Sequence, residues 1–550
     1  MIKHVFFAIA AMLILSNSIA QKAAPKNWHL LDPTTTGYNG ISLQKAYDLA
    51  KAKKLKSKKV IVAVIDSGID TAHEDLKSVL WVNPKEIPGN GIDDDRNGYI
   101  DDINGWNFIG GKDGRNVKEN SLEGVRVYYA LKPKWEGKTI ADAITEAEKK
   151  ELKEYERAKQ KVVGEVDEMQ MKQLTFMMQK ITVGDSIIRK EIGKEEYTVK
   201  DLEKYTPTDS DAKMAKGIIS SISKANNTSD ITNKQLIEEL AGELRKGENA
   251  TKAPPAYRKD IVKDDETNFE DQFYGNNDLL ANTPFHGTHC AGIIAAARNN
   301  GKGIDGIADN VSIMAIRAVP DGDEHDKDIA LAIRYAVDNG AKIISMSFGK
   351  DFSPEKYWVD AAFKYAESKN VLLVHAAGND AKNVDTTYNY PNPTFADGSG
   401  RAKNVITVGA SGDKTNGGLT ASFSNYGKKE VDLFAPGVSI YSTIPGGDKY
   451  GEASGTSMAC PVVAGIAGLI MQYYPTLSAL QVKEAIEKSA VVSKEKVNNP
   501  ETKEKVLLSS LSKTGGFVNA FEALKYAGNM VASKKPLVIP ASKVKVSKKS

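Results

Sequence analysis

The sequence predicts an α/β protein with a mostly parallel central sheet, helices on both faces and an inserted helical subdomain. Five short, β-branched runs are continuously apolar, which is typical of strands buried on both faces; they cover 60–65, 313–319, 342–346, 371–374 and 405–408. Helical patterns at 326–339 and 354–368 lie between the later strands, and this alternation favours a parallel sheet. Between the first two of these apolar runs, the segment 112–265 is rich in Lys and Glu and has helical periodicity but few strand-like runs.

Composition bounds the class of protein. A chain of 550 residues that is 41% hydrophobic has ample material for a core. Its net charge is only +3, from 74 basic and 71 acidic residues, so nothing indicates a nucleic-acid or anionic-membrane partner. The two cysteines, Cys290 and Cys460, do not form a disulfide framework of the kind that staples small secreted domains.

The N-terminus has the pattern of a signal peptide. Lys3 precedes an apolar run at 5–15, and Ser18-Ile19-Ala20 offers small residues for cleavage after Ala20. We therefore expect 1–20 to be removed and the protein to be exported, to the periplasm or outside the cell. The run is too short to span a bilayer comfortably and no comparable run follows, so no transmembrane segment is expected.

The predicted helical insert, 112–265, separates two parts of the sheet domain, 21–111 and 266–527. Its apolar residues, from Ile140 to Met169, recur at mostly three- or four-residue intervals, which predicts one long helix capped by Thr139 or Asp142. Shorter helices are expected at 212–223 and 234–246. The methionines are expected to pack internally: Met169, Met171, Met177 and Met178. The Lys-rich tail, 528–550, is expected to be disordered.

Polar and glycine residues follow three of the predicted strands. Asp66 ends the first strand, and the other segments are Ser347-Phe348-Gly349 and Ala376-Ala377-Gly378-Asn379. The carboxyl ends of strands in an open α/β sheet line its ligand crevice. An Asp at the end of an apolar strand either starts a turn or orients a histidine.

A serine and a histidine each open a helix of small, apolar residues. Ser457 precedes the apolar run 462–474, so its backbone N–H and the helix dipole can face an oxyanion, although a plain N-cap has the same pattern. Pro461 is expected within the first turn. His286 could act as the base for such a serine. A metal pair with His289 is the alternative, but the H-E-x-x-H glutamate is missing.

Together, three segments resemble the signatures of the subtilase family, in that family's chain order of Asp, His and Ser; they are Asp66-Ser67-Gly68, His286-Gly287-Thr288-His289 and Gly455-Thr456-Ser457-Met458-Ala459. The resemblance covers about 40–107 and 268–526. It implies a serine endopeptidase whose substrates are peptides or proteins. Such an enzyme needs no cofactor for catalysis. Asp66 would orient His286, His286 would act as general base and then acid, and Ser457 would attack the peptide carbonyl.

The same resemblance implies further site residues. Asn379 matches the family's side-chain oxyanion donor. Asn389 matches the base of the S1 cleft, which binds the substrate side chain that precedes the scissile bond. Two backbone edges would line that cleft, the first from Ser347, Phe348 and Gly349 and the second from Ala376, Ala377 and Gly378. Cys290 would stay reduced, as family members with a cysteine after the His motif keep it. A bridge from Cys290 to Cys460 is the alternative.

Two acidic stretches suggest structural calcium. Asp75 matches a family calcium ligand, and Asn299 falls near the family's calcium-holding loop. Separately, Asp93, Asp95 and Asn97 alternate before Gly98 as in the first half of an EF-hand loop. The closing glutamate of that motif is missing, so a plain Asp/Asn/Gly turn is the alternative.

The chain departs from the family pattern because 220 positions separate Asp66 from His286. The insert fills this gap and must emerge near the cleft, where we expect it to limit substrate size; alternatively, it completes the fold or builds the site. Two other functions are open: a catalytically silent, partner-binding scaffold and a metal-dependent hydrolase. The complete set of Asp66, His286, Ser457 and Asn379 argues against the scaffold.

Overall fold

The computed structural model describes residues 24–164, 168–226, 232–281 and 284–533. The predicted signal peptide, 1–20, lies outside these residues, as does 534–550 of the predicted tail. Helix α15 (Ala520–Ser533) extends through 528–533, so the disorder expected there is wrong for those six residues. Ala523, Leu524 and Ala527 anchor α15 by packing into the main core.

A nine-stranded sheet forms the centre of the molecule, in the order β10-β13-β7-β6-β5-β4-β1-β3-β2. Neighbouring strands are parallel except for β10 with β13, which confirms the predicted α/β class with a mostly parallel sheet. The five predicted strands are β1 (Val60–Asp66), β3 (Val311–Arg317), β4 (Ile343–Met346), β5 (Leu372–Ala376) and β6 (Val405–Ser411). The others are β2 (Gly105–Asn107), β7 (Leu433–Pro436), β10 (Val491–Val492) and β13 (Gly516–Phe517).

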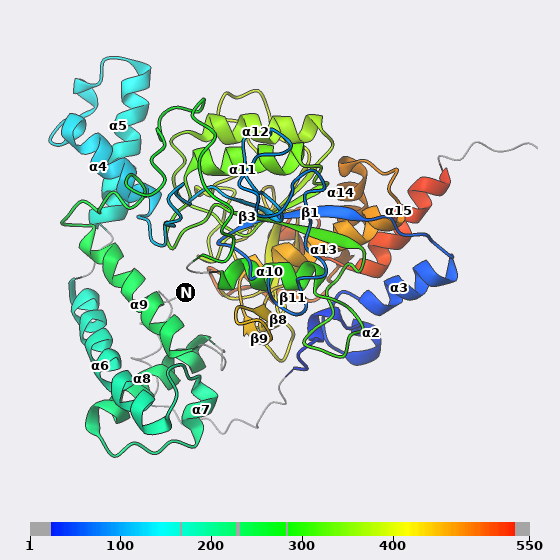
Figure 1. Ribbon diagram of the computed structural model, residues 1–550, viewed down its shortest axis with the longest axis horizontal. Helices are drawn as coiled ribbons and strands as arrows, with labels where there is room; N and C mark the ends of the chain where they lie inside the picture. The colour runs from blue at the N-terminus through cyan, green and yellow to red at the C-terminus, as the bar shows by residue number, and fades with distance from the viewer. Residues whose placement is uncertain (1–23, 165–167, 227–231, 282–283, 534–550) are drawn as a thin grey trace, which may run out of the picture.

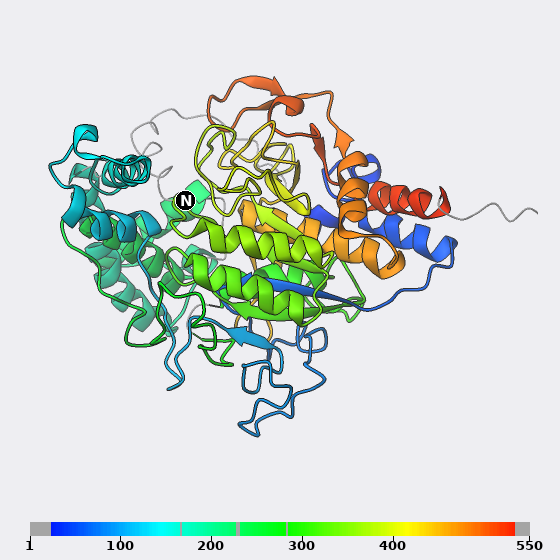
Figure 2. The same cartoon turned by 90° about the horizontal axis from the view of Figure 1, so that it is seen from above.

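Helices cover both faces of this sheet (Figures 1 and 2). The predicted helices α11 (Asp326–Asp338) and α12 (Lys356–Ser368) pack on one face, against Ala63 and Ile65 of β1 among others. On the other face lie α10 (Phe285–Ala295) and α13 (Thr456–Tyr473), against Val62 and Val64. Alternate side chains of β1 thus enter different cores, which is why the strand is apolar at every position.

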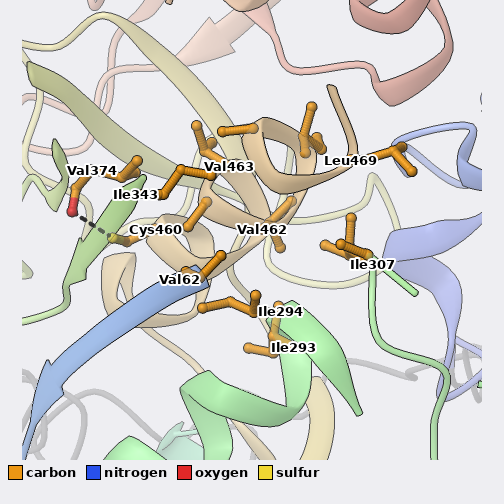
Figure 3. Close-up of a cluster of buried hydrophobic side chains, with 14 of the residues drawn as sticks. Val62, Ile293, Ile294, Ile307, Ile343, Val374, Cys460, Val462, Val463 and Leu469 are labelled. Atoms are coloured by element: carbon orange, nitrogen blue, oxygen red, sulfur yellow. Dashed lines mark hydrogen bonds between the residues drawn. The ribbon is translucent and has the colours of Figure 1, made fainter. Parts of the chain in front are cut away.

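Helix α13 runs through the middle of the larger core. Figure 3 shows Val462 and Val463 of α13 among side chains from the sheet and α10, including Val62, Ile343 and Ile293. Within the described residues, α13 alone is long and apolar enough to match a membrane span, and it is mostly buried in this core.

Six α-helices lie between β2 and α10: α4 (Glu123–Trp135), α5 (Glu146–Lys159), α6 (Glu168–Ile192), α7 (Val199–Glu203), α8 (Ser210–Asn226) and α9 (Asn233–Glu248). Helices α8 and α9 confirm the two shorter predicted helices. The single long helix expected from Thr139 or Asp142 to Met169 is wrong, because Thr145 forms a capping box with Glu148 and starts α5 there. Ile144, just before this cap, is 86% exposed.

These helices lie in two groups (Figure 1). Each group has its own cluster of buried apolar side chains. Helices α6 to α9 enclose their own core, in which Met171, Met177 and Met178 are partly buried. Met169 is 70% exposed, so its expected internal packing is wrong. The cluster of α4 and α5 is not self-contained, because it includes Phe352 from the sheet domain.

The two ends of the described chain are joined. Helix α3 (Leu43–Ala52) packs beside α15 (Figure 1), the Ala520 N–H donates to Ile41 O at 2.8 Å, and Asn519 Nδ2 donates to Ser42 Oγ at 2.9 Å. Upstream, the Trp28 indole is fully buried and Nε1 donates to Val438 O at 3.2 Å.

The remaining elements are η2 (Trp28–Leu30), α2 (Pro33–Thr36), η3 (Ile140–Asp142), η4 (Gln160–Gly164), β8 (Ile440–Ile444), β9 (Lys449–Ala453), α14 (Ala479–Lys488), β11 (Lys496–Asn498), β12 (Lys505–Leu507) and η5 (Leu508–Ser510).

Candidate active site

Asp66 and His286 meet at the carboxyl end of β1, although 220 positions separate them. His286 Nδ1 lies 2.7 Å from Asp66 Oδ1, which also accepts a 2.7 Å hydrogen bond from the Ser67 N–H. The Asp66 side chain is 3% exposed and that of His286 is 37% exposed. The carboxylate is thus held within the protein, while the imidazole is partly exposed.

Two opposing effects set the protonation of His286. Burial lowers the pKa of the imidazole, but the charge of Asp66 and its hydrogen bond raise it and outweigh burial, so the net pKa is raised above 6.5. With Nδ1 facing Asp66, Nε2 is the ring nitrogen left to exchange a proton with another group.

Ser457 is the second residue of α13, so its backbone N–H has no acceptor within the helix. Its hydroxyl donates to Ser347 O at 3.1 Å, and no hydrogen bond to His286 occurs in the described part of the chain. Catalytic hydrogen bonds of unliganded enzymes often form only when substrate binds. The structure therefore brings Asp66 and His286 into direct contact and places Ser457 beside the cleft edge, with its hydroxyl turned to Ser347.

Pro461 lies deeper in α13 than expected. The helix begins at Thr456, so Pro461 is its sixth residue, and the expectation of a first-turn position is wrong. Proline has no N–H to donate to the carbonyl four residues earlier, which is Ser457 O. That carbonyl accepts instead from Ser347 Oγ at 3.0 Å and from Cys290 Sγ at 3.3 Å. Because Pro461 leaves the Ser457 carbonyl free, this carbonyl links the start of α13 to Ser347, which follows β4, and to α10.

The Asn379 side chain is fixed by Thr456. Asn379 Oδ1 accepts from both the N–H and the hydroxyl of Thr456 at 2.9 Å, and Thr456 Oγ1 accepts from the Gly378 N–H at 3.0 Å. This leaves Asn379 Nδ2 as the free end of the amide, near Gly455 and Ser457. The sequence pattern alone predicts no role for Thr456, although it stands directly before Ser457.

The two predicted cleft edges face each other across Asn389. A Cβ built on Gly349 of the first edge (347–349) would lie 3.5 Å from Asn389 Oδ1, and one on Gly378 of the second edge (376–378) would lie 3.6 Å from it. Gly378 also has φ +99°, and a side chain there would meet Asn425 Nδ2 at 2.3 Å, so only glycine fits. Asn425 Nδ2 donates to Ala377 O at 2.9 Å and supports this edge.

Two other histidines are occupied elsewhere. His375 is buried and its Nε2 lies 2.9 Å from Phe348 O of the first edge, so it is a hydrogen-bonded core residue. His289 Nε2 lies 2.9 Å from Ile440 O on β8, so this ring is directed at backbone. This orientation disfavours the metal pair of His286 with His289.

Both cysteines are buried free thiols. Cys290 Sγ faces Ser457 O, whereas Cys460 Sγ faces Val374 O at 3.3 Å, the contact drawn in Figure 3. Burial raises the pKa of the Cys460 thiol to about 11 and that of Cys290 well above its usual value. Both groups are therefore protonated at neutral pH and poor nucleophiles.

The surroundings of Asp75 do not fit a calcium ion. Asn300 Nδ2 donates to Asp75 Oδ1 at 2.6 Å and the Tyr450 hydroxyl lies 2.8 Å from Oδ2. The Lys302 ammonium forms an ion pair with the adjacent Glu74. Calcium requires oxygen ligands whose lone pairs face the ion. Here hydrogen-bond donors occupy both carboxylate oxygens of Asp75 and a lysine pairs with the adjacent Glu74, so these contacts do not favour calcium at Asp75. The assignment of Asn299 stays a prediction.

The loop with Asp93, Asp95 and Asn97 suits calcium better. Carboxylate oxygens of Glu86, Asp93 and Asp95 lie within 4.8 Å of one another. The N–H groups of Asn97 and Gly98 donate to Asp93 at 3.0 and 2.8 Å, as in a loop wrapped around its own carboxylates. Such an oxygen-only set matches the preference of calcium. Glu86 was missed because it precedes the motif by seven residues.

Comparisons with known proteins point to one family. Residues 57–511 match the model of the Subtilase family. A thermophilic serine proteinase of Bacillus sp. (strain AK1) is 43% identical over 206 residues, 37% of this chain and 46% of the relative. Thermitase of Thermoactinomyces vulgaris is 37% identical over 255 residues, 46% of this chain and 80% of the relative.

A solved structure of proteases from Pseudoalteromonas arctica has a TM-score of 0.45 at 20% identity, over 91% of this chain and 97% of that one. The chain thus spans less than half the length of one of the curated relatives it matches and four-fifths of the other. Because the family match covers most of its length, the chain belongs to the subtilase family of serine endopeptidases.

Proposed function

We propose that this chain is an active, exported serine endopeptidase with Asp66, His286 and Ser457 as its catalytic triad. The observation that carries the proposal is the 2.7 Å contact of His286 Nδ1 with the buried Asp66 carboxylate, at the strand end beside Ser457. Export is supported by the signal-like pattern of 1–20 and is consistent with the relative named as a cell wall-associated protease of Bacillus subtilis.

The proposed reaction begins when substrate binding turns the Ser457 hydroxyl from Ser347 O to His286 Nε2. The imidazole takes the proton as Oγ attacks the peptide carbonyl, and Asp66 stabilises the imidazolium that results. The developing oxyanion accepts from Asn379 Nδ2 and the Ser457 N–H. His286 then protonates the leaving amine, and a water activated by the same base hydrolyses the acyl-enzyme.

The substrates of this reaction are extended peptide segments of proteins. The two edges, 347–349 and 376–378, offer backbone groups on either side of Asn389, as an extended substrate strand requires. Asn389 makes the base of the S1 cleft polar.

A serine-directed phosphonate tests the function. We expect one equivalent to label Ser457, as peptide mapping by mass spectrometry would show, with parallel loss of peptide hydrolysis. A metal-dependent hydrolase would instead lose activity in chelator and stay unlabelled. A silent scaffold would show neither labelling nor hydrolysis.

Replacing Asn379 by alanine is expected to lower kcat by about 10²–10³-fold, which corresponds to about 2.7–4 kcal/mol of transition-state stabilisation. KM should change little, because the oxyanion forms only in the transition state. Steady-state kinetics on a peptide anilide measures both constants. Lys382→Ala, on the same loop with a side chain that is 35% exposed, is the control, and similar losses in both variants would contradict the role of Asn379.

We further propose that Glu86, Asp93, Asp95 and Asn97 hold a structural calcium ion. Chelation by EDTA is then expected to lower the Tm, because an ion that binds only the folded state stabilises it. The double variant Asp93→Asn/Asp95→Asn should have a low Tm that EDTA does not change, whereas Asp75→Asn should keep its response to EDTA. Differential scanning calorimetry measures these shifts, and equal Tm values of the unmodified protein with and without EDTA would refute the site.

A further inference from the structure

A buried ion pair joins α4 to the segment that directly follows the first cleft edge. Lys350 comes after Gly349, and its Nζ donates to Glu123 Oε2 on α4 at 2.7 Å. Asp326 Oδ1 at 2.9 Å and Glu324 O at 2.8 Å complete three acceptors for the three ammonium protons. The side chains of Lys350 and Glu123 are only 2% and 7% exposed.

The backbone of Lys350 touches the other side of the cleft. Its N–H donates to Tyr390 O and its carbonyl accepts from the Tyr390 N–H, both at 2.9 Å. Tyr390 follows Asn389, the residue between the two edges. Lys350 therefore connects the first edge with the base of the cleft, and Glu123 connects Lys350 with α4.

The charges of this junction are fixed by their mutual contacts. Burial alone would raise the pKa of Glu123, but Arg126 and Lys350 outweigh it and lower that pKa to about 2. Arg126 also bonds to Glu123, and the Glu123 N–H donates to Asp323 Oδ2 at 2.7 Å. A buried pair of this kind contributes little net stability but has one favourable geometry, so it specifies position.

Helix α5 and the following η4 hold the next residues of the same segment. Arg157 Nη1 donates to Asp351 O at 2.7 Å, and Lys161 forms an ion pair with Asp351 at 2.8 Å. The Arg157 guanidinium also lies 3.6 Å from the ring centre of Phe352, which belongs to the cluster of α4 and α5. Three successive residues after the edge, 350–352, are thus held by α4, α5 and η4.

We propose that Glu123 and Lys350 are positioning residues that set the width of the S1 cleft. Helix α4 then supports one side of the cleft. The first edge is correctly positioned relative to Asn389 only when the ion pair between Glu123 and Lys350 is formed. This proposal rests on the proposed function. It differs from the expectation that the insert limits substrate size, since contacts of α4 and α5 with the edge favour a part in building the site.

The variants Glu123→Gln, Lys350→Met and the combination of both test the proposal. A shift of about 1 Å in a positioning group can cost about 10²-fold in rate, and here it should act on the substrate side chain that enters the S1 cleft. With a peptide anilide carrying the preferred side chain before the scissile bond, we expect KM to rise about tenfold and kcat to change less than threefold. With glycine at that position, KM should stay within twofold.

Two further measurements keep the outcome decisive. Lys350→Met leaves the buried Asp326 without this cation and Glu123 with Arg126 alone, and can fail to fold; Glu123→Gln and the charge-balanced double variant then carry the test. Asp264→Asn is the matched control, because the Asp264 side chain is also buried, pairs with Arg258 and Lys327, and has no hydrogen bond or ion pair with 347–350 in the described structure. It should lower the Tm without changing KM.

Labelling by a small phosphonyl fluoride separates the two proposals. It should proceed within twofold of the normal rate in all folded variants, because the reagent does not enter the S1 cleft. Folded Glu123→Gln with unchanged KM, or with equal KM changes for both substrates, would overturn the positioning role. Failure of the unmodified protein to be labelled would overturn the proposed function instead.

Discussion

Replacing Ser457 by alanine is expected to remove almost all peptidase activity, by about 10⁶-fold in kcat, the magnitude known for the triad serine of subtilisin. The nucleophile is lost, and the rest of the site gives only about 10³–10⁴-fold over water through binding and the oxyanion hole. The Tm should change little, since the Ser457 hydroxyl makes a single hydrogen bond among the described residues, to Ser347 O. Single-turnover assays with a peptide anilide and thermal unfolding measure both.

Ser442→Ala serves as the control for this variant. Ser442 is buried and donates to His289 O at 2.8 Å, so its loss removes a hydroxyl near α10 without touching the triad. Activity should remain within a few-fold. Near-normal turnover by Ser457→Ala would end the proposed mechanism.

Asp66→Asn should lower kcat by about 10⁴-fold, because an amide favours the wrong imidazole tautomer. The pH profile gives a second signature. In the unmodified protein, kcat/KM should fall as pH drops through a pKa above 6.5, since Asp66 raises the pKa of His286 and protonation removes the base. Without the Asp66 charge, burial dominates and lowers that pKa, so the acidic limb of the residual activity should move to lower pH.

Asp70→Asn is the matched control for Asp66→Asn. Asp70 is buried four residues later, and its Oδ2 accepts from the Gly446 N–H at 3.0 Å, away from the imidazole. This variant should lose stability and keep the acidic limb where it was. An unchanged limb in Asp66→Asn would show that Asp66 does not control the protonation of His286.

The chemistry-bearing segments were predictable because each is local. The strand that ends at Asp66 and the helix that starts at Ser457 are visible as short apolar runs beside a polar residue. The contact of Asp66 with His286 was inferred only from the family resemblance, since 220 intervening positions hide it. Glu86 and Thr456 were missed because their partners come from other turns or other strands.

The predicted helix boundaries were wrong where two capping signals lie close together in the sequence, and a helix was missed where its packing partner is far away in the sequence. Thr139 and Thr145 both begin capping boxes, and the apolar spacing from Ile140 onward concealed the break between them. Helix α4 was not predicted, and part of its apolar face packs on Phe352, more than two hundred positions away. Ion pairs such as Glu123 with Lys350 leave no periodic trace in sequence.

The joining of α3 with α15 has a consequence for the order in which this protein folds. Asn519 and Ser42 are 477 positions apart, and Trp28 reaches Val438 across 410. Contacts of such long range close only after the intervening chain is present, and they make folding slow. A growing chain therefore carries Asp66, His286 and Ser457 well before α3 can dock on α15. The fold is complete only once 520–533 have emerged, so we expect the activity of the proposed triad to appear only after that helix has docked.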